Sequence, residues 1–145
     1  MFQTLAYYAT VFHRSFTAYT TQRLQQLGLS FGSLFPVTYV GKHPGCTQAE
    51  LTAALGLDWG YSQRCITKLV EEEFLTREKS GRAYHLNLSA KGQDAFSVSH
   101  QVFFDWDQET RTALSEAERA QLFALLSKVS GKGRTSPCTK PSSAL

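Results

Sequence analysis

The chain lacks a long hydrophobic run, and this argues against a membrane-spanning helix. Its apolar runs are only a few residues long, whereas a membrane-spanning helix needs roughly 20 apolar residues. The opening residues, MFQTLAYYATVFHRSF, contain no basic segment followed by an apolar stretch, so they do not predict a secretory signal. We therefore expect a cytoplasmic protein with no membrane partner.

Cysteine is scarce, and the motifs of metal sites and of common enzyme classes are missing. The three cysteines are Cys46, Cys65 and Cys138. An odd, sparse set indicates reduced thiols and not a disulfide framework. There is no Cys-x-x-Cys pair, no histidine pair at helical ligand spacing, no phosphate-binding loop and no catalytic triad context. We expect no cofactor, no metal site and no enzymatic activity.

Net charge by itself gives little support for nucleic-acid binding. The chain carries +3, but residues 128–145 contribute four basic residues and no acid, which leaves 11 basic against 12 acidic residues elsewhere. The composition of residues 130–145 predicts a flexible basic tail. The hydrophobic fraction of 42% is ordinary for a globular fold. Any case for DNA must come from the local placement of charge.

Long helices are predicted at both ends of the chain. Residues 4–27 contain no glycine or proline and repeat apolar residues every three or four positions, up to a stop at Gly28. Ser89 is expected to cap a helix over residues 90–112. Ser115 and Glu118 have the spacing of a capping box that starts a last helix, ending near residue 129.

The middle of the chain predicts a helix-turn-helix followed by a hairpin. A helix over residues 32–43 precedes two capped helices, 47–55 and 59–73, which are joined by a short turn at Gly56. Thr47 with Glu50 forms a capping box, and Asp58 caps the second helix. Strands at 75–78 and 83–88 flank a loop over 79–82. The fold class is therefore mainly α, a winged helix-turn-helix with a small β-hairpin wing and an added helical region.

The second helix of this pair has the chemistry of a DNA-reading element. In a helix-turn-helix its leading end enters the major groove. Gln63 can bond an adenine edge, and Arg64 can grip a guanine or a phosphate. Tyr61 and Ser62 can donate to phosphate oxygens, and Lys68 lies one turn beyond Arg64.

The hairpin offers a second contact with the duplex. Arg82 at its tip, with Lys79 nearby, is placed to enter a narrow minor groove, where the potential is strongly negative. The run Glu71-Glu72-Glu73 does not count against DNA, because it lies at the far end of the helix.

Residues 47–92, from TQAEL to SAKG, resemble the core of the MarR family of transcriptional regulators, and the likeness extends over about residues 3–129. The resemblance implies a triangular homodimer bound to a pseudo-palindrome. Residues 1–31 and 89–129 would form the helical dimerisation region, and residues 32–88 the winged helix-turn-helix. Together with the side-chain chemistry it predicts DNA contacts at Trp59, Gly60, Tyr61, Ser62, Gln63, Arg64, Lys68, Lys79 and Arg82.

The chain departs from this family at two places. The wing usually carries an Asp two residues before its arginine, and here that position is Ser80. The recognition helix opens Trp59-Gly60-Tyr61, where small or basic residues are usual.

The resemblance also implies control by a ligand bound between the dimerisation helices and the DNA-binding lobe. Members commonly respond to small aromatic or phenolic compounds, oxidants or metals. An aromatic-rich pocket with His13 and Tyr39 as polar handles would suit a flat organic effector that releases a repressor. The candidate lining residues are Tyr8, Phe12, His13, Phe16, Phe35, Tyr39, Phe96 and Phe103. Each of these aromatics is also compatible with a place in the core.

Three alternatives stay open. Oxidation of Cys65 within the recognition helix could disrupt DNA binding, although a buried small hydrophobe is the favoured interpretation. Cys46 follows Gly45 in an expected loop and should be more exposed. The four histidines could serve a metal-responsive regulator, and His85 is expected to face out of a wing strand. Finally, a winged helix can serve protein–protein contact without DNA.

Overall fold

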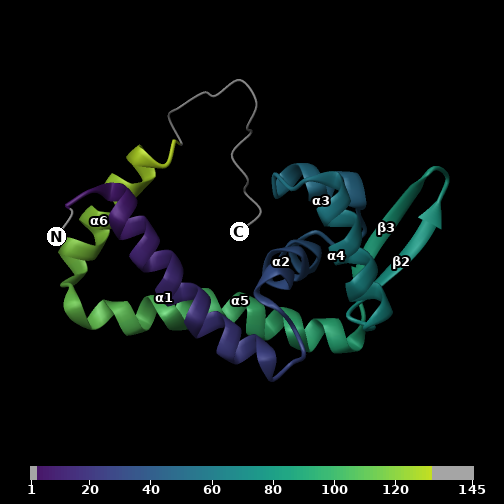
Figure 1. Ribbon diagram of the computed structural model, residues 1–145, viewed down its shortest axis with the longest axis horizontal. Coiled ribbons are helices and arrows are strands. Elements are labelled where there is room, and N and C mark those ends of the chain that lie inside the picture. Colours follow the sequence, from purple (N-terminus) through teal and green to yellow (C-terminus); the bar gives the residue numbers. More distant parts are fainter. Residues whose placement is uncertain (1–2, 132–145) are drawn as a thin grey trace.

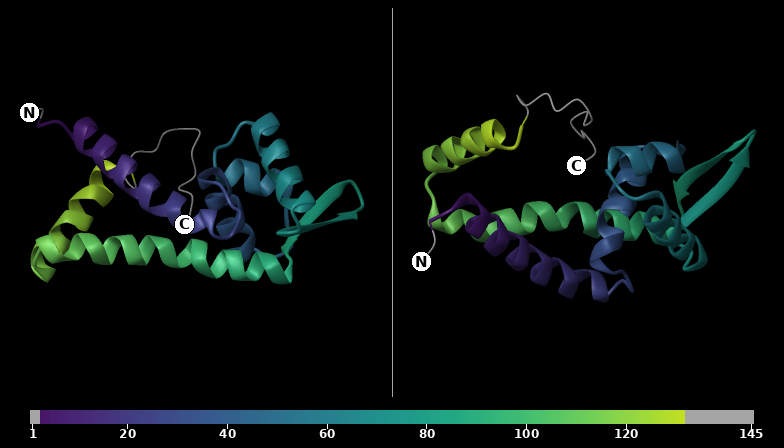
Figure 2. Two further views of the ribbon diagram at one scale, coloured as in Figure 1. Left: turned by 60° about the horizontal axis from the view of Figure 1, so that its bottom comes forward. Right: turned by 45° about the horizontal axis from the view of Figure 1, so that its top comes forward.

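The computed structural model describes residues 3–131 and confirms the mainly α winged-helix class (Figure 1). One end of the molecule is a lobe that holds α2, α3, α4 and the hairpin, and the other end holds α6 (Figures 1 and 2). Two long helices, α1 and α5, run between these ends. The predicted basic tail lies outside the described residues from 132 onward. The elements are α1 Leu5–Gln25, η1 Phe31–Ser33, α2 Leu34–Lys42, β1 Cys46–Thr47, α3 Gln48–Ala54, α4 Trp59–Glu71, β2 Leu75–Ser80, β3 Ala83–Leu88, α5 Ala90–Thr110, η2 Arg111–Ala113 and α6 Glu116–Val129.

The predicted helix starts are confirmed by their capping geometry. The Thr47 and Ser115 hydroxyls accept from the backbone N–H groups of residues 50 and 118, and the two glutamates at those positions return the bond, so both capping boxes form. Asp58 accepts from Tyr61 N–H at the start of α4, and Ser89 accepts from Gly92 N–H at the start of α5. Local side-chain chemistry thus defines where these helices begin.

Helices α3 and α4 end in the same way, but with different residues. After α3, Gly56 adopts φ +62°, and the N–H groups of Gly56 and Leu57 bond back to the carbonyls of Ala53 and Thr52. This is a Schellman motif. After α4, Glu73 takes the equivalent position at φ +64°. The helix was predicted to reach residue 73, but it ends at Glu71 because the backbone of Glu73 is left-handed. This conformation is sterically unfavourable for residues other than glycine.

A short strand missed by the sequence analysis completes a three-stranded antiparallel sheet in the order β1-β3-β2. Cys46 of β1 pairs with Leu86 of β3, and its side chain is buried. The expectation of an exposed Cys46 is therefore wrong. His85 alternates with the buried Leu86 along β3, so its side chain lies on the opposite face of the hairpin, as expected. His85 is half-buried, with Nδ1 2.9 Å from the Gly45 carbonyl oxygen.

The wing is longer than predicted. β2 and β3 pair from Leu75–Leu88 to Ser80–Ala83, which leaves a turn of two residues, Gly81 and Arg82. Gly81 at φ +63° occupies the first turn position, as a type II′ hairpin turn requires. Lys79 therefore lies in β2 and not in the loop, whereas Arg82 stands at the tip as predicted.

Helices α2, α3 and α4 of the lobe share one hydrophobic core. Leu34, Val37 and Val40 of α2 are fully buried, and so are Leu51 of α3 and Ile66 of α4. Large apolar side chains such as these contribute roughly 1.5–3 kcal/mol each when fully buried. Together they hold α4 against the lobe along one side and leave its other side exposed.

The end of α4 is fastened to the start of α5 by three residues. The Ser89 hydroxyl lies within hydrogen-bond distance of the Glu73 and Phe74 carbonyl oxygens. Lys91 Nζ donates to the Glu72 carbonyl at 2.8 Å and lies 4.1 Å from the centroid of the Phe74 ring. A Cβ at Gly92 would stand 2.0 Å from the Phe74 carbonyl oxygen, so the backbones meet there only because residue 92 is glycine. We call Ser89, Lys91 and Gly92 the α4–α5 clamp.

We predict that Gly92→Ala lowers the free energy of unfolding by about 1–3 kcal/mol, because the new methyl group must displace backbone atoms. Urea unfolding followed by circular dichroism measures this. Gly60→Ala is the matched control. Its Cβ meets only the ends of flexible side chains at 3.2 Å or more, so that variant should be unchanged or gain up to about 1 kcal/mol. Equal stability of Gly92→Ala and the unmodified chain would refute the close contact.

Candidate nucleic-acid interface

The exposed side of α4 carries most of the side chains predicted to meet DNA. Trp59 is 52% exposed and Tyr61 is 43% exposed, and Gln63, Arg64 and Lys68 are also exposed. The Asp58 cap holds the first turn of the helix. The leading end of α4 therefore stands clear of its own chain within the described residues.

The Tyr61 side chain packs against Gly32 of η1. A Cβ at Gly32 would lie 2.7 Å from the Tyr61 hydroxyl, so Gly32 in η1 leaves room for that side chain. Gly60, one residue earlier, is half-buried and lies between Asp58 and Arg64. The first turn of α4 is thus packed on η1 while its outer side stays open.

Ser62 does not belong to this surface, and its predicted phosphate contact is wrong. Its side chain is fully buried, and its hydroxyl lies 2.6 Å from Thr52 Oγ1. Thr52 donates its own proton to the Gln48 carbonyl, so the Ser62 hydroxyl is the donor. It lies four residues before Ile66, on the side of α4 that faces the core. Ser62 therefore joins α4 to α3.

The positive charge of Lys68 is partly offset by the carboxylate of Glu72. Its Nζ lies 3.9 Å from the Glu72 carboxylate, one turn further along. Both side chains are substantially exposed, so the pair contributes little to stability. Lys68 remains a candidate phosphate contact, with its charge partly offset.

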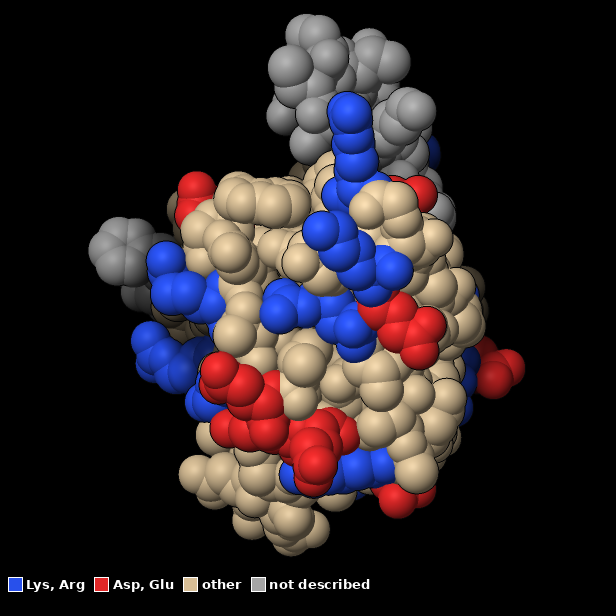
Figure 3. Space-filling view, turned by 90° about the vertical axis from the view of Figure 1, so that its right-hand side faces the viewer, with Lys and Arg blue, Asp and Glu red and all other residues tan. Residues whose placement is uncertain are grey.

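The wing presents three basic residues, of which the sequence analysis identified two. Arg82 and Lys79 are exposed, at the tip and in β2 respectively. Arg77, also exposed, was missed. It lies two residues before Lys79 and therefore on the same side of β2, and this alternation is visible in the sequence. Figure 3 shows Lys and Arg side chains gathered on the upper part of this end of the molecule, above a group of acidic side chains.

The predicted effector pocket is assembled only in part. A groove of about 450 Å³ opens between α1 and α5, and it brings together four of the eight predicted residues: Phe12, His13, Phe16 and Phe103. Its other lining residues, which were not predicted from the sequence, are Phe104, Trp106 and Asp107.

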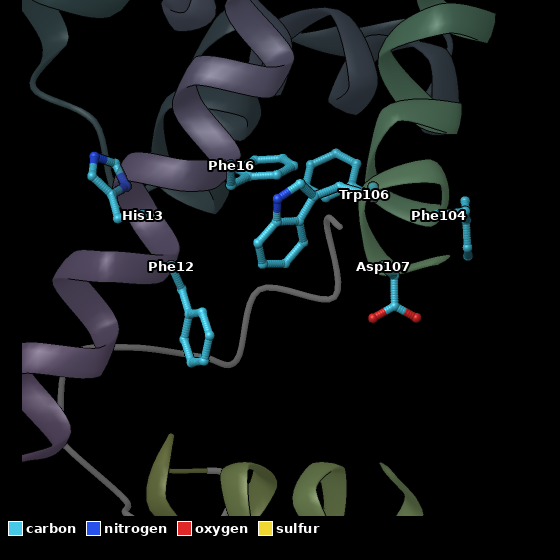
Figure 4. Close-up of a pocket in the computed structure, with 7 residues that line it drawn as sticks. Phe12, His13, Phe16, Phe104, Trp106 and Asp107 are labelled. Atoms are coloured by element: carbon cyan, nitrogen blue, oxygen red, sulfur yellow. The ribbon is translucent and has the colours of Figure 1, made fainter. Parts of the chain in front are cut away.

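The indole of Trp106 is the centre of this groove. It meets the rings of Phe12 and Phe16 edge to face, with centroids 6.4 and 5.5 Å away. Its Nε1 donates to Ser15 Oγ at 3.3 Å. Figure 4 shows the three rings close together, with His13 and Asp107 on opposite sides of them. The groove is thus an aromatic surface with a single carboxylate at its edge.

The other four predicted pocket residues do not line this groove. Tyr8 is on the outside of α1, beside Tyr7. Tyr39 is buried and stacks on His43, with ring centroids 4.5 Å apart. The remaining two serve as packing. Phe35 contacts Phe31 and Phe103 behind the groove, and Phe96 fills the space beside Gly41.

The two cysteines within the described residues are poor redox sensors. Burial, followed by the nearby Glu50 carboxylate, raises the pKa of Cys46 to about 11. Burial also raises the pKa of the partly buried Cys65. Raised pKa values favour the protonated thiol at both positions, and the thiolate is the reactive form.

Residues 3–131 contain neither a candidate membrane span nor a candidate metal-binding cluster. No helix in that range is both long and apolar enough to cross a membrane. Nor does that range contain a cluster of three histidine, cysteine, aspartate or glutamate residues able to hold a metal ion.

Known proteins resemble this chain in sequence and in fold. The HTH-type transcriptional regulator BilQ of Clostridium symbiosum is 41% identical over 143 residues, which cover 97% of this chain and 99% of that protein. The S. aureus MepR–DNA complex superposes with a TM-score of 0.78 at 21% identity, covering 87% and 95% of the two chains. A mutant MarR from E. coli complexed with operator DNA gives 0.75 at 22% identity, covering 86% and 92%. No family model matches the sequence.

Proposed function

The chain belongs to the MarR family of winged helix-turn-helix transcriptional regulators, and we propose that it is a repressor that binds a pseudo-palindromic DNA site as a homodimer. The single observation that carries this proposal is the exposed leading end of α4, with Gln63 and Arg64 side by side and a basic wing next to it. Regulators of this family are not enzymes. Such a protein acts in the cytoplasm, where its free thiols stay reduced.

DNA recognition divides between α4 and the wing. Gln63 and Arg64 project from α4 as groups able to read base edges in the major groove. Trp59, Gly60, Tyr61 and Lys68 flank them and supply contacts to the sugar–phosphate backbone. Arg82 at the hairpin tip enters the minor groove, with Lys79 following along β2.

A second copy of the chain completes the molecule. Helix α6 has no buried residue, and several of its large apolar side chains are exposed: Phe123, Leu125, Leu126 and Val129. The first half of α1 is exposed in the same way at Leu5, Tyr8 and Val11. Apolar surface of this extent is typical of an interface. Residues 1–31 and 89–129 form the dimerisation region in this proposal, residues 32–88 the DNA-binding region, and the particle in solution has twice the 16.2 kDa mass of one chain.

The groove between α1 and α5 is the place for an effector. Its lining is largely aromatic, and all of its lining residues lie on α1 and α5, two helices of the proposed dimerisation region. A flat organic molecule can stack on Trp106 and Phe16. Binding there changes how α1 packs on α5, and α5 is clamped to α4, so the spacing of the two recognition helices responds.

We predict that Arg64→Ala weakens binding to a duplex selected from a random pool by about 1–3 kcal/mol and relaxes the base preference at one position of each half-site. Arg64→Lys should keep the salt dependence but lose the preference, because lysine lacks the bidentate fork. Lys42→Ala, an exposed residue at the end of α2 outside the proposed contacts, is the control. Fluorescence anisotropy over a salt series measures all four proteins. An equal loss on every sequence would reduce Arg64 to a phosphate contact, and no salt-dependent binding by the unmodified chain would favour a protein-binding module.

We also predict that 2-naphthol, a flat phenol, binds this groove and lowers duplex affinity. Calorimetry should give one site per chain, and Trp106→Ala should weaken that site by about 1 kcal/mol, because the ligand no longer stacks on the indole. Trp59→Ala, on α4 and outside the groove, is the matched control and should bind 2-naphthol normally. Undiminished binding to Trp106→Ala would place the effector elsewhere.

A further inference from the structure

An exposed tyrosine in the wing lies beneath two cations. Tyr84 of β3 is 43% exposed, and it belongs to no buried cluster. The guanidinium carbon of Arg77 lies 5.1 Å from its ring centroid, and Lys79 Nζ lies 5.9 Å from the same centroid. Lys79 is directly opposite Tyr84 across the hairpin, and Arg77 is the diagonal neighbour on the same side. One ring therefore contacts both cations of β2.

Among the described residues, no carboxylate forms an ion pair with the cations of this hairpin. The ion pairs found within residues 3–131 join Arg23 to Asp105, Lys68 to Glu72 and Arg119 to Glu116. None of them involves Arg77, Lys79 or Arg82. Ser80, where related wings carry an aspartate, supplies no charge either. The ring of Tyr84 is thus the group that orders Arg77 and Lys79 in the described structure.

An aromatic ring and a carboxylate can each hold a cation in place, but they differ in how much of its charge and how many of its N–H donors stay free for a second partner. A carboxylate orders an arginine but cancels its charge and occupies its donors. A ring attracts the cation through its quadrupole and leaves the positive charge and the N–H groups free for a second partner. An Arg or Lys already held in place also loses less side-chain entropy when it meets a phosphate. The arrangement therefore suits cations that must bind an anion from solvent.

We propose that Tyr84 is a positioning residue of the wing, whose ring holds Arg77 and Lys79 as a preordered pair for the phosphodiester backbone of a bound duplex. This rests on the proposed DNA-binding function. It adds a phosphate-binding side of β2 to the contact expected from the Arg82 tip, and it gives Tyr84 a role without direct contact to a base.

The test is a set of dissociation constants, measured over a salt series on one duplex long enough to span two adjacent major grooves. Tyr84→Leu keeps bulk but removes the π-face, and it should weaken binding about two- to fivefold. Tyr84→Phe keeps the face and should bind like the unmodified chain. Arg77→Gln with Lys79→Gln should weaken binding and reduce the slope of log affinity against log salt by about 0.9 for each phosphate that the protein no longer neutralises.

The decisive comparison is the triple variant. If Tyr84 acts through the two cations, adding Tyr84→Leu to the Arg77→Gln, Lys79→Gln protein changes nothing further. Lys42→Gln, an exposed residue at the end of α2 outside the proposed contacts, is the charge control. Urea unfolding of Tyr84→Leu checks that the fold is kept.

Several results would overturn the proposal: full affinity of Tyr84→Leu, failure of Tyr84→Phe to restore binding, or an undiminished effect of Tyr84→Leu in the triple variant. If the unmodified chain binds no duplex at any salt concentration, the proposed function fails together with this inference.

Discussion

The α4–α5 clamp is the constraint on which the rest of the structure depends. Through Ser89, Lys91 and Gly92, the last turn of α4 is bound directly to the first turn of α5. Helix α5 has 21 residues and is therefore about 30 Å long. A continuous helix thus leads from the end of the recognition helix toward α6. The direction in which α4 points follows from the way α5 is held.

The clamp also resolves an electrostatic problem at the end of α4. Glu71, Glu72 and Glu73 gather where the helix dipole already places partial negative charge, which is unfavourable. The Lys91 ammonium sits on the Glu72 carbonyl and offsets that charge. The helix is left with a basic leading part and an acidic trailing part, so repulsion by phosphates disfavours docking through the wrong end. The same residues that fix the helix in space thereby support its polarity.

Local chemistry in the sequence was enough to find the helices, their caps, the turn at Gly56 and the hairpin. The errors arose where partners distant in sequence decide the outcome. A two-residue strand such as β1 exists only because Leu86 pairs with Cys46. The end of α4 at Glu71 could not be predicted, because the left-handed residue that follows it is Glu73 and not a glycine. Ser62 was predicted to contact phosphate because it is polar, although its spacing of four residues from Ile66 puts it on the buried side of α4. The groove around Trp106 depends on how α1 packs on α5, which periodicity along one helix does not report.

The most direct test of the account is the symmetry of the DNA site. Duplexes selected from a random pool by the unmodified protein should contain two inverted half-sites whose centres lie about 10 base pairs apart, one helical turn. Hydroxyl-radical footprints should show protection of the minor groove on both outer sides, where the two wings lie. A single, unpaired recognition motif with one protected patch would contradict a regulator built from two α4 helices held at a fixed distance by two α5 rods.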